Sequence, residues 1–187
     1  MRKLQLMISP LVLVACQGTD TPPIPDMTTP DAHSFAQPAQ VRSQHLSLNL
    51  TLDFEAKVAT GSVTHDLVRD AKSSPFIVDT NELAIVAVTD EVGQALTWNL
   101  AEDQGAWRGQ PLTIDLEEST SKVRIQYATS PMSEAMQWLA PEQTHDKEMP
   151  FLFTQGQAIL TRSWIPLQDT PAVRVTWDAL IKAPAGM

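Results

Sequence analysis

Apolar and polar residues alternate along most of the chain with a period of two, which is typical of β-strands with one solvated face. The clearest stretch is 45–54, where four leucines alternate with polar residues. Short, turn-rich gaps separate the strand candidates, and helix is expected only as one or two turns at 133–139. The pattern predicts an all-β fold, an antiparallel β-sandwich or saddle-shaped sheet. The other expected strands lie at 59–67, 76–79, 84–89, 95–100, 111–116, 123–127 and 173–179.

The amino terminus has the pattern of a bacterial export signal. Two basic residues precede an apolar run at 4–14, which is too short to span a bilayer as a permanent helix. The run ends Leu-Val-Ala-Cys, which fits the lipobox of bacterial lipoproteins with Cys16 as the acylated residue. An ordinary signal with a chance cysteine is the alternative. We therefore predict a signal peptide at 1–15 and an exported, membrane-anchored lipoprotein. Gln17 favours the outer membrane, with the protein facing the periplasm or the cell surface.

A segment rich in proline and threonine follows the signal. Residues 16–40 show no apolar period, so they are predicted to form a disordered tether between the lipid and the domain. The remaining residues, 41–187, are enough for one domain with a hydrophobic core.

Composition excludes several classes of function. Cys16 is the only cysteine, so the domain can have neither a disulfide of its own nor a cysteine-based zinc site. The formal net charge is −9, and basic residues do not cluster, which argues against binding to nucleic acid or to anionic lipid.

Catalytic motifs are missing from the sequence. The histidines are His33, His45, His65 and His145, and none belongs to a His-Glu-x-x-His pattern. A catalytic zinc site needs three protein ligands, which no spacing here supplies. The nucleophile motif Gly-x-Ser-x-Gly is also absent. We therefore predict no metal site in this chain and no hydrolytic activity of the chain alone.

One short motif offers polar groups in an apolar setting. Gln155, Gly156, Gln157 and Ala158 lie between two apolar runs, so side-chain amides flank a place where backbones can approach closely. From the residues alone, a buried loop whose amides bond to the backbone is the favoured interpretation. Contact with a ligand is the alternative.

The motif belongs to a larger pattern. Together with 46–64, with 135–143 (Ala-Met-Gln-Trp-Leu-Ala-Pro-Glu-Gln) and with 162–171 (Arg-Ser-Trp-Ile-Pro-Leu-Gln-Asp-Thr-Pro), it resembles the N-terminal domain of M1 zinc aminopeptidases. The similarity is greatest to the branch of leukotriene A4 hydrolase and aminopeptidase B, which carries Gln-x-Gln-Ala where most of the family has Gln-x-Glu-Ala. The chain departs from the pattern at Leu167, where the family usually has cysteine.

The resemblance implies roles for three residues. Gln157 would face the free α-amino group of a peptide, Ala158 would offer its backbone beside the scissile bond, and Gln155 would line the same region. The catalytic zinc would belong to a further domain that these 187 residues do not contain, and additional strands of the N-terminal domain are also expected, so the domain would be truncated at its C-terminal end.

The expected function follows from that resemblance. The chain would be the substrate-positioning domain of a metallo-aminopeptidase, with peptide N-termini and the missing catalytic domain as its partners. The alternative is a stand-alone, lipid-anchored β-sandwich that binds peptides or other partners without catalysis.

Overall fold

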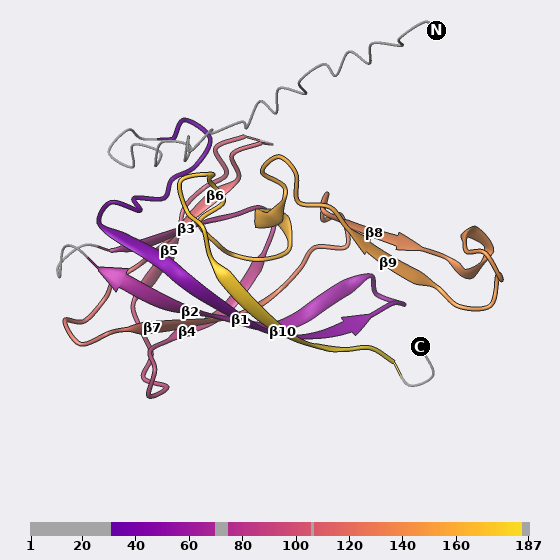
Figure 1. The fold of residues 1–187 in the computed structure, drawn as a ribbon, viewed down its shortest axis with the longest axis horizontal. Coiled ribbons are helices and arrows are strands. Elements are labelled where there is room, and N and C mark those ends of the chain that lie inside the picture. Colours follow the sequence, from indigo (N-terminus) through magenta and orange to yellow (C-terminus); the bar gives the residue numbers. More distant parts are fainter. Residues whose placement is uncertain (1–30, 70–74, 106, 185–187) are drawn as a thin grey trace, which may run out of the picture.

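The computed structural model describes residues 31–69, 75–105 and 107–184. The predicted signal peptide, Cys16 and the first part of the tether lie outside these residues. The described part of the chain forms ten strands and two 3₁₀ turns, η1 (Pro141–Gln143) and η2 (Thr161–Ser163), and contains no α-helix. This confirms the all-β prediction. Figure 1 shows how the strands are arranged. The strands are β1 (Val41–Asp53), β2 (Val58–Arg69), β3 (Phe76–Thr80), β4 (Ala84–Thr89), β5 (Trp98–Leu100), β6 (Gln110–Ile114), β7 (Lys122–Ala128), β8 (Met136–Leu139), β9 (Phe151–Thr154) and β10 (Thr176–Lys182).

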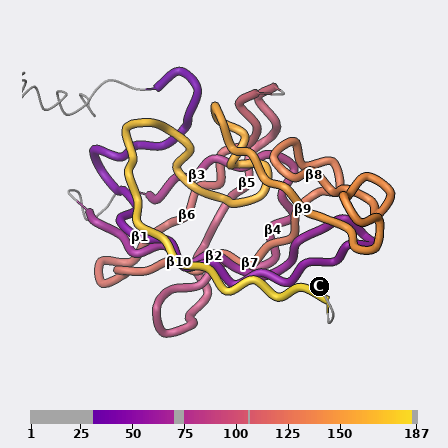
Figure 2. The backbone as a smooth tube through the Cα atoms, turned by 45° about the vertical axis from the view of Figure 1, so that its right-hand side comes forward, coloured from indigo at the N-terminus to yellow at the C-terminus, as the bar shows by residue number. Residues whose placement is uncertain are grey.

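Three sheets build the domain. The largest has five strands in the order β10-β1-β2-β7-β4, and the second has three in the order β3-β6-β5. The second sheet lies over one face of the first, and the hairpin β8–β9 extends to one side of both (Figures 1 and 2). All pairings are antiparallel except that of β10 with β1.

The hydrophobic core fills the space between the two larger sheets. The leucines of the alternating stretch confirm the predicted orientation, since Leu46, Leu48 and Leu50 are buried. Gly61 lets β2 approach β1, because a Cβ built there would lie 1.9 Å from the carbonyl oxygen of Asn49. The core is completed by Val41, Val63, Phe76, Val78, Leu83, Val88, Leu96, Leu112, Ile114, Val123, Ile125, Tyr127 and Ile165.

The structure differs from the sequence prediction in its short strands. The segment 133–139 was expected to be helical, but it is a turn that leads into β8, which pairs with β9. Strands of four residues are too short for their period to be distinguished from that of a helical turn. The last strand begins at Thr176 rather than at 173, because the preceding residues form a turn in which the Val173 N–H donates to the carbonyl oxygen of Thr170 at 3.1 Å.

The domain also begins earlier than residue 41. The Asp79 carboxylate, on β3, accepts hydrogen bonds from the Ser34 hydroxyl at 2.6 Å and from the Phe35 N–H at 2.8 Å. Residues 31–40, assigned to the tether from their composition, are therefore attached to the domain. Polar contacts of this kind leave no periodic signal in a sequence.

Candidate functional site

The Gln155–Ala158 loop follows directly from the last residue of β9. The Gln155 N–H donates to the carbonyl oxygen of Ala135 at 2.9 Å, which continues the β8–β9 register by one more pair. The carbonyl oxygen of Gly156 then accepts a hydrogen bond from Leu160 N–H at 2.9 Å, which closes the turn. A Cβ at residue 156 would lie 2.2 Å from the Thr161 hydroxyl oxygen, so any larger residue there would force the Thr161 side chain to move.

The structure shows the loop on the surface. Gln155, Gln157 and Ala158 are all exposed, and the Gln155 side-chain oxygen accepts the N–H of Gln157 at 3.0 Å. The interpretation as a buried loop is therefore wrong. The loop therefore presents amide donors and acceptors on the surface, and the Gln155 side chain helps to fix the backbone of Gln157.

Two buried serines hold this loop and the β8–β9 hairpin together. The Ser163 hydroxyl donates to the carbonyl oxygen of Leu160 at 2.7 Å and accepts the Ala135 N–H at 3.1 Å. It also lies 3.0 Å from the Ser133 hydroxyl. These contacts join the residues before β8 to η2, the turn that follows the loop, so the loop is supported on both sides. The contact between Ser133 and Ser163 spans 30 residues, so no local pattern in the sequence indicates it.

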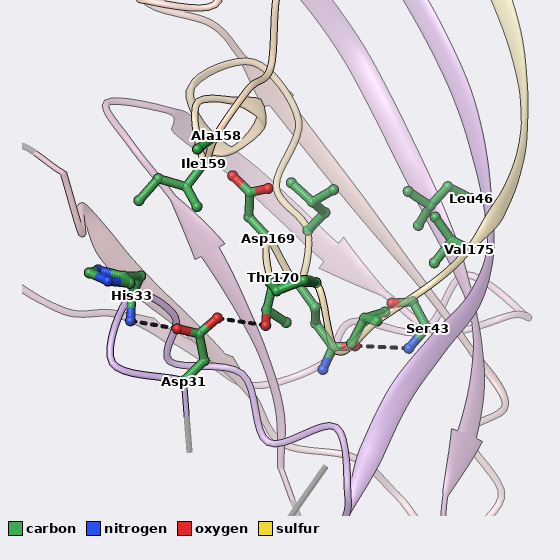
Figure 3. Close-up of a pocket in the computed structure, with 13 residues that line it drawn as sticks. Asp31, His33, Ser43, Leu46, Ala158, Ile159, Asp169, Thr170 and Val175 are labelled. Atoms are coloured by element: carbon green, nitrogen blue, oxygen red, sulfur yellow. Dashed lines mark hydrogen bonds between the residues drawn. The ribbon is translucent and has the colours of Figure 1, made fainter. Parts of the chain in front are cut away.

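A groove of about 500 Å³ lies next to the loop (Figure 3). Ala158 contributes to its wall, whereas Gln155 and Gln157 do not. The structure therefore separates the three predicted site residues into one at the groove and two outside it. The residues that line the groove are Asp31, His33, Ser43, Leu46, Ala158, Ile159, Leu167, Gln168, Asp169, Thr170, Pro171, Val173 and Val175.

Asp31 supplies a carboxylate at the edge of this groove. It accepts the Thr170 hydroxyl at 2.7 Å and the His33 N–H at 2.8 Å, and Figure 3 shows both bonds. Partial burial acts to raise the pKa of Asp31, but these hydrogen bonds and the nearby charges of His33 and Arg162 hold it below its ordinary value. Asp31 is therefore an anion at neutral pH.

A buried ionic network supports the other side of the groove. Arg162 is 1% exposed, and its Nε lies 3.3 Å from Asp169 Oδ2. One terminal nitrogen donates to the carbonyl oxygen of Arg108 at 2.8 Å, and the other lies 3.7 Å from Asp79 Oδ2. Burial raises the pKa of the Asp169 carboxyl, although hydrogen bonds from Arg162 oppose the shift. The network fixes 162–169 to β3, so the role of Arg162 and Asp169 is structural.

His65 lies on β2 and is fully buried in the core, although polar residues flank it in the sequence. Its Nδ1 lies 2.9 Å from the Ser43 hydroxyl and its Nε2 lies 3.1 Å from the carbonyl oxygen of Pro166. Burial lowers the pKa of His65 to about 4, so the ring is neutral at pH 7. Its hydrogen bonds are fully used by the fold, which leaves no catalytic role for it.

The described residues do not fit a zinc site. Among residues 31–69, 75–105 and 107–184, no three histidine, cysteine or acidic side chains come together in a way that could hold a metal ion. The same ranges also lack a helix with the length and apolar character needed to cross a membrane. The chemistry available at the loop is hydrogen bonding and positioning through its amide groups.

Comparison with known proteins agrees with this geometry. Residues 42–187 match the family model described as the peptidase M1 N-terminal domain. The chain is 38% identical over 161 residues to leukotriene A-4 hydrolase of Xenopus laevis, and 36% identical over 150 residues to leucine aminopeptidase 2 of Neurospora crassa. These alignments cover 82% and 76% of the chain but only 26% and 22% of the relatives, so the chain spans about a quarter of their length.

Solved structures show the same relationship. Native leukotriene A4 hydrolase from Saccharomyces cerevisiae superposes with a TM-score of 0.76 at 29% identity, over 84% of this chain and 26% of the enzyme. An M1 zinc metallopeptidase from Deinococcus radiodurans shares the fold, with a TM-score of 0.59 at 20% identity, over 80% of this chain and 34% of that one. The chain belongs to the M1 peptidase family, and the part of the family's architecture that it carries is the N-terminal domain.

Proposed function

We propose that this domain holds the amino terminus of a peptide for an M1 aminopeptidase whose zinc-bearing domain is not among these 187 residues. The observation that carries the proposal is the exposed Gln155–Ala158 loop on its rigid support. The loop offers side-chain amide groups on the surface, while the serines fix the adjoining η2 segment to the β8–β9 hairpin and the buried ionic network fixes that segment to the domain.

Each loop residue would have a separate task. The Gln157 side-chain oxygen would accept a hydrogen bond from the peptide's α-ammonium group, and the Ala158 backbone would lie beside the peptide bond to be cleaved. The Gln155 side-chain oxygen would position Gln157 by accepting a hydrogen bond from the Gln157 backbone N–H. An amide carries no net charge, so Gln157 would bind the ammonium group less strongly than a carboxylate would.

The absent domain would supply the reaction chemistry. A zinc ion there would polarise the peptide carbonyl and activate water, and the residues described here would hold and orient the substrate. Two solved relatives have been crystallised with ligands, which supports the proposal. One is yeast leukotriene A4 hydrolase in complex with bestatin, and the other is the Deinococcus radiodurans enzyme bound to a Tyr-Ser-Ala substrate.

The proposal extends to the location of the protein. Acylation of Cys16 would anchor the domain to a bacterial membrane, the outer membrane by our expectation, with the peptidase site in the periplasm or at the cell surface. Two or more acyl chains give stable anchoring, because each buried methylene contributes about 0.8 kcal/mol. Metabolic labelling with a palmitate analogue tests this, and loss of the label in Cys16→Ser is the expected result.

A chimera tests the peptidase proposal. Residues 31–187 of this chain would replace the corresponding N-terminal region of the yeast enzyme, and hydrolysis of aminoacyl-arylamides would be measured. We expect Gln157→Ala to lower kcat/KM by about 10- to 100-fold, because it removes a hydrogen bond to a charged group. The matched control is Gln94→Ala, at an exposed glutamine in the turn after β4.

The results separate the two candidate functions. An active chimera that loses activity only with the change at residue 157 supports the positioning role. An active chimera that is indifferent to Gln157→Ala would overturn it. For the 187-residue chain alone with added zinc, we expect no turnover, whereas tight binding of peptides by that chain alone would favour the stand-alone binding protein.

A further inference from the structure

A polar hollow lies on the outer face of the five-stranded sheet, the face that is turned away from the core. Its volume is about 360 Å³, which falls within the range of roughly 300 to 1,000 Å³ typical of ligand pockets. It lies over the centre of the sheet, on β1, β2, β7 and β4. The polar side chains that line it belong to Asn49, Thr51, Thr60, Ser62, Arg124 and Gln126.

The position of this hollow separates it from the places where further parts of the protein would join. A strand added to the sheet pairs beside an edge strand, β10 or β4, and so extends the sheet without covering its centre. A domain that contacts the Gln155–Ala158 loop approaches from the other side, because the groove beside that loop is lined by Leu46, which belongs to the core. Polar residues along the outer face are typical of a solvated sheet surface. The hollow is therefore open to ligands.

Ser62 forms the floor of the hollow. The strand register places it between Asn49 on β1 and Gln126 on β7, so two side-chain amides flank it. Ser62 is only 4% exposed, and its hydroxyl makes no hydrogen bond to any residue that the structure describes. A largely buried hydroxyl without a hydrogen-bond partner is unfavourable, so the floor of the hollow favours a ligand atom that can donate or accept one.

Arg124 gives the hollow a positive charge. It is exposed on β7, on the same face as Gln126. Within residues 31–69, 75–105 and 107–184 its guanidinium group has no ion pair, whereas the ammonium group of the neighbouring Lys122 lies 2.8 Å from an Asp66 carboxylate oxygen. The described residues that line the hollow include no carboxylate. The charge of Arg124 is therefore available to an anionic ligand.

Val86 adds an apolar contact to this polar lining. The register of β4 with β7 shifts between Ile85 and Ala87, and Val86, between them, is 68% exposed and lines the hollow. The hollow thus combines one cation, several neutral hydroxyls and amides, and one apolar side chain. A sugar ring that carries a carboxylate has the matching groups, since its hydroxyls both donate and accept hydrogen bonds and its C–H groups are apolar.

We propose that this hollow binds a sugar acid, a pyranose ring that bears a carboxylate. The carboxylate pairs with the Arg124 guanidinium group, which can donate two parallel hydrogen bonds to it. The ring hydroxyls bond to Ser62 and to the flanking amides of Asn49 and Gln126, and the C–H groups of the ring contact Val86. This binding goes beyond the peptidase function and does not depend on it.

Other classes of ligand fit the hollow less well. A neutral sugar would leave Arg124 without a partner. A nucleic acid needs several cations along its phosphates, and the hollow has one, on a chain with a formal net charge of −9. A small carboxylate such as acetate would pair with Arg124 but would leave the Ser62 hydroxyl and the two amides without ligand contacts.

Titration with a trimer of galacturonic acid tests the proposal. The full chain would be kept in a nonionic detergent without sugar groups, and binding would be followed by saturation-transfer NMR of the ligand. We expect saturable binding of the acidic trimer. The neutral galactose trimer of the same linkage should bind at least about tenfold more weakly, because it has no charge to pair with Arg124. Acetate should also bind at least about tenfold more weakly, because it has no ring hydroxyls.

Two variants locate the site. Arg124→Ala should raise the Kd of the acidic trimer by about tenfold or more, and Ser62→Ala should raise it by about threefold. Arg174→Ala, at an exposed arginine just before β10, is the matched control and should leave the Kd unchanged. Because Arg124 is exposed, urea unfolding of Arg124→Ala should match that of the original chain, so a weaker Kd would not reflect a loss of fold.

Four outcomes would contradict the proposal. The first is no saturable binding of the acidic trimer, and the second is an equal Kd in Arg124→Ala. The third is an equal Kd for the neutral trimer or for acetate, which would exclude a sugar acid as the preferred ligand. The fourth concerns the chimera with the yeast enzyme, which should bind the acidic trimer with a Kd within about threefold of that of the chain. Loss of binding in the chimera would show that the catalytic part covers the outer face.

Discussion

Arg162 is the residue whose removal should damage the domain most. It is 1% exposed, and it lies between Asp169, 12% exposed, and Asp79, which is fully buried. Asp79 also accepts hydrogen bonds from Ser34, Phe35 and the Asp169 N–H. Arg162→Ala would leave two buried carboxylates without their cation and would break the link from the loop 162–169 to β3.

The size of the effect follows from this burial. Removing one partner of a buried ion pair costs about 3 to 5 kcal/mol, because the remaining charge stays desolvated. The Arg162 side chain also donates to the carbonyl oxygens of Arg108 and Asp169, which would lose their hydrogen bonds. We therefore expect the free energy of unfolding to fall by about 4 kcal/mol at pH 7.

Urea unfolding followed by tryptophan fluorescence measures this change. Arg124→Ala, at an exposed arginine on β7, is the matched control and should change stability by less than about 0.5 kcal/mol. The difference between Arg162→Ala and the original chain should shrink as the pH falls. Without the arginine, burial raises the pKa of the Asp169 carboxyl further above its unfolded value, and protonation then favours the folded state. A loss below about 1 kcal/mol at pH 7 would refute the reasoning.

Three other changes should affect stability. The pKa of His65 is about 4 in the folded state, so between pH 6.5 and 4 its imidazole binds a proton only in the unfolded chain. The free energy of unfolding should therefore fall by up to about 3 kcal/mol as the pH drops through that window. Denaturation at a series of pH values checks this, and a slope unchanged in His65→Gln would contradict it. Gly61→Ala should destabilise by more than about 2 kcal/mol, since φ is 153° and the new Cβ would meet the Asn49 carbonyl; a thermal midpoint equal to the original would disprove the clash. Ser34→Ala should lower the free energy of unfolding by about 1 to 2 kcal/mol, because it removes a donor from the buried Asp79 carboxylate; an unchanged free energy would contradict a stabilising bond between Ser34 and Asp79.

The long strands could be predicted because one face of each is buried. In β1, the leucines at every second position face the core, and the polar residues between them face away from it. The same signal identified β2, β3, β4, β6 and β7. The Gln155–Ala158 motif could be located by its resemblance to a family, whereas its exposure could not, because apolar runs on both sides suggested burial.

The missed features depend on contacts between distant residues. The hairpin β8–β9 is short, and Phe151 and Phe153 on one of its faces are exposed, so its sequence shows no buried face. The bonds from Ser34 and Phe35 to Asp79 span 45 and 44 residues, and no local pattern reports them. The sequence also gives no sign that β10 pairs in parallel with β1. A period of two shows which residues share a face of a strand, but not which strands lie beside it.

The most direct test of the proposed function is a crystal structure of the chimera with a peptide or peptide-like inhibitor bound at the zinc. The account predicts that the side-chain oxygen of Gln157 lies within about 2.7 to 3.2 Å of the ligand's free amino group. A bound ligand whose amino group is held entirely by other residues, with the Gln155–Ala158 loop facing away from it, would contradict the account.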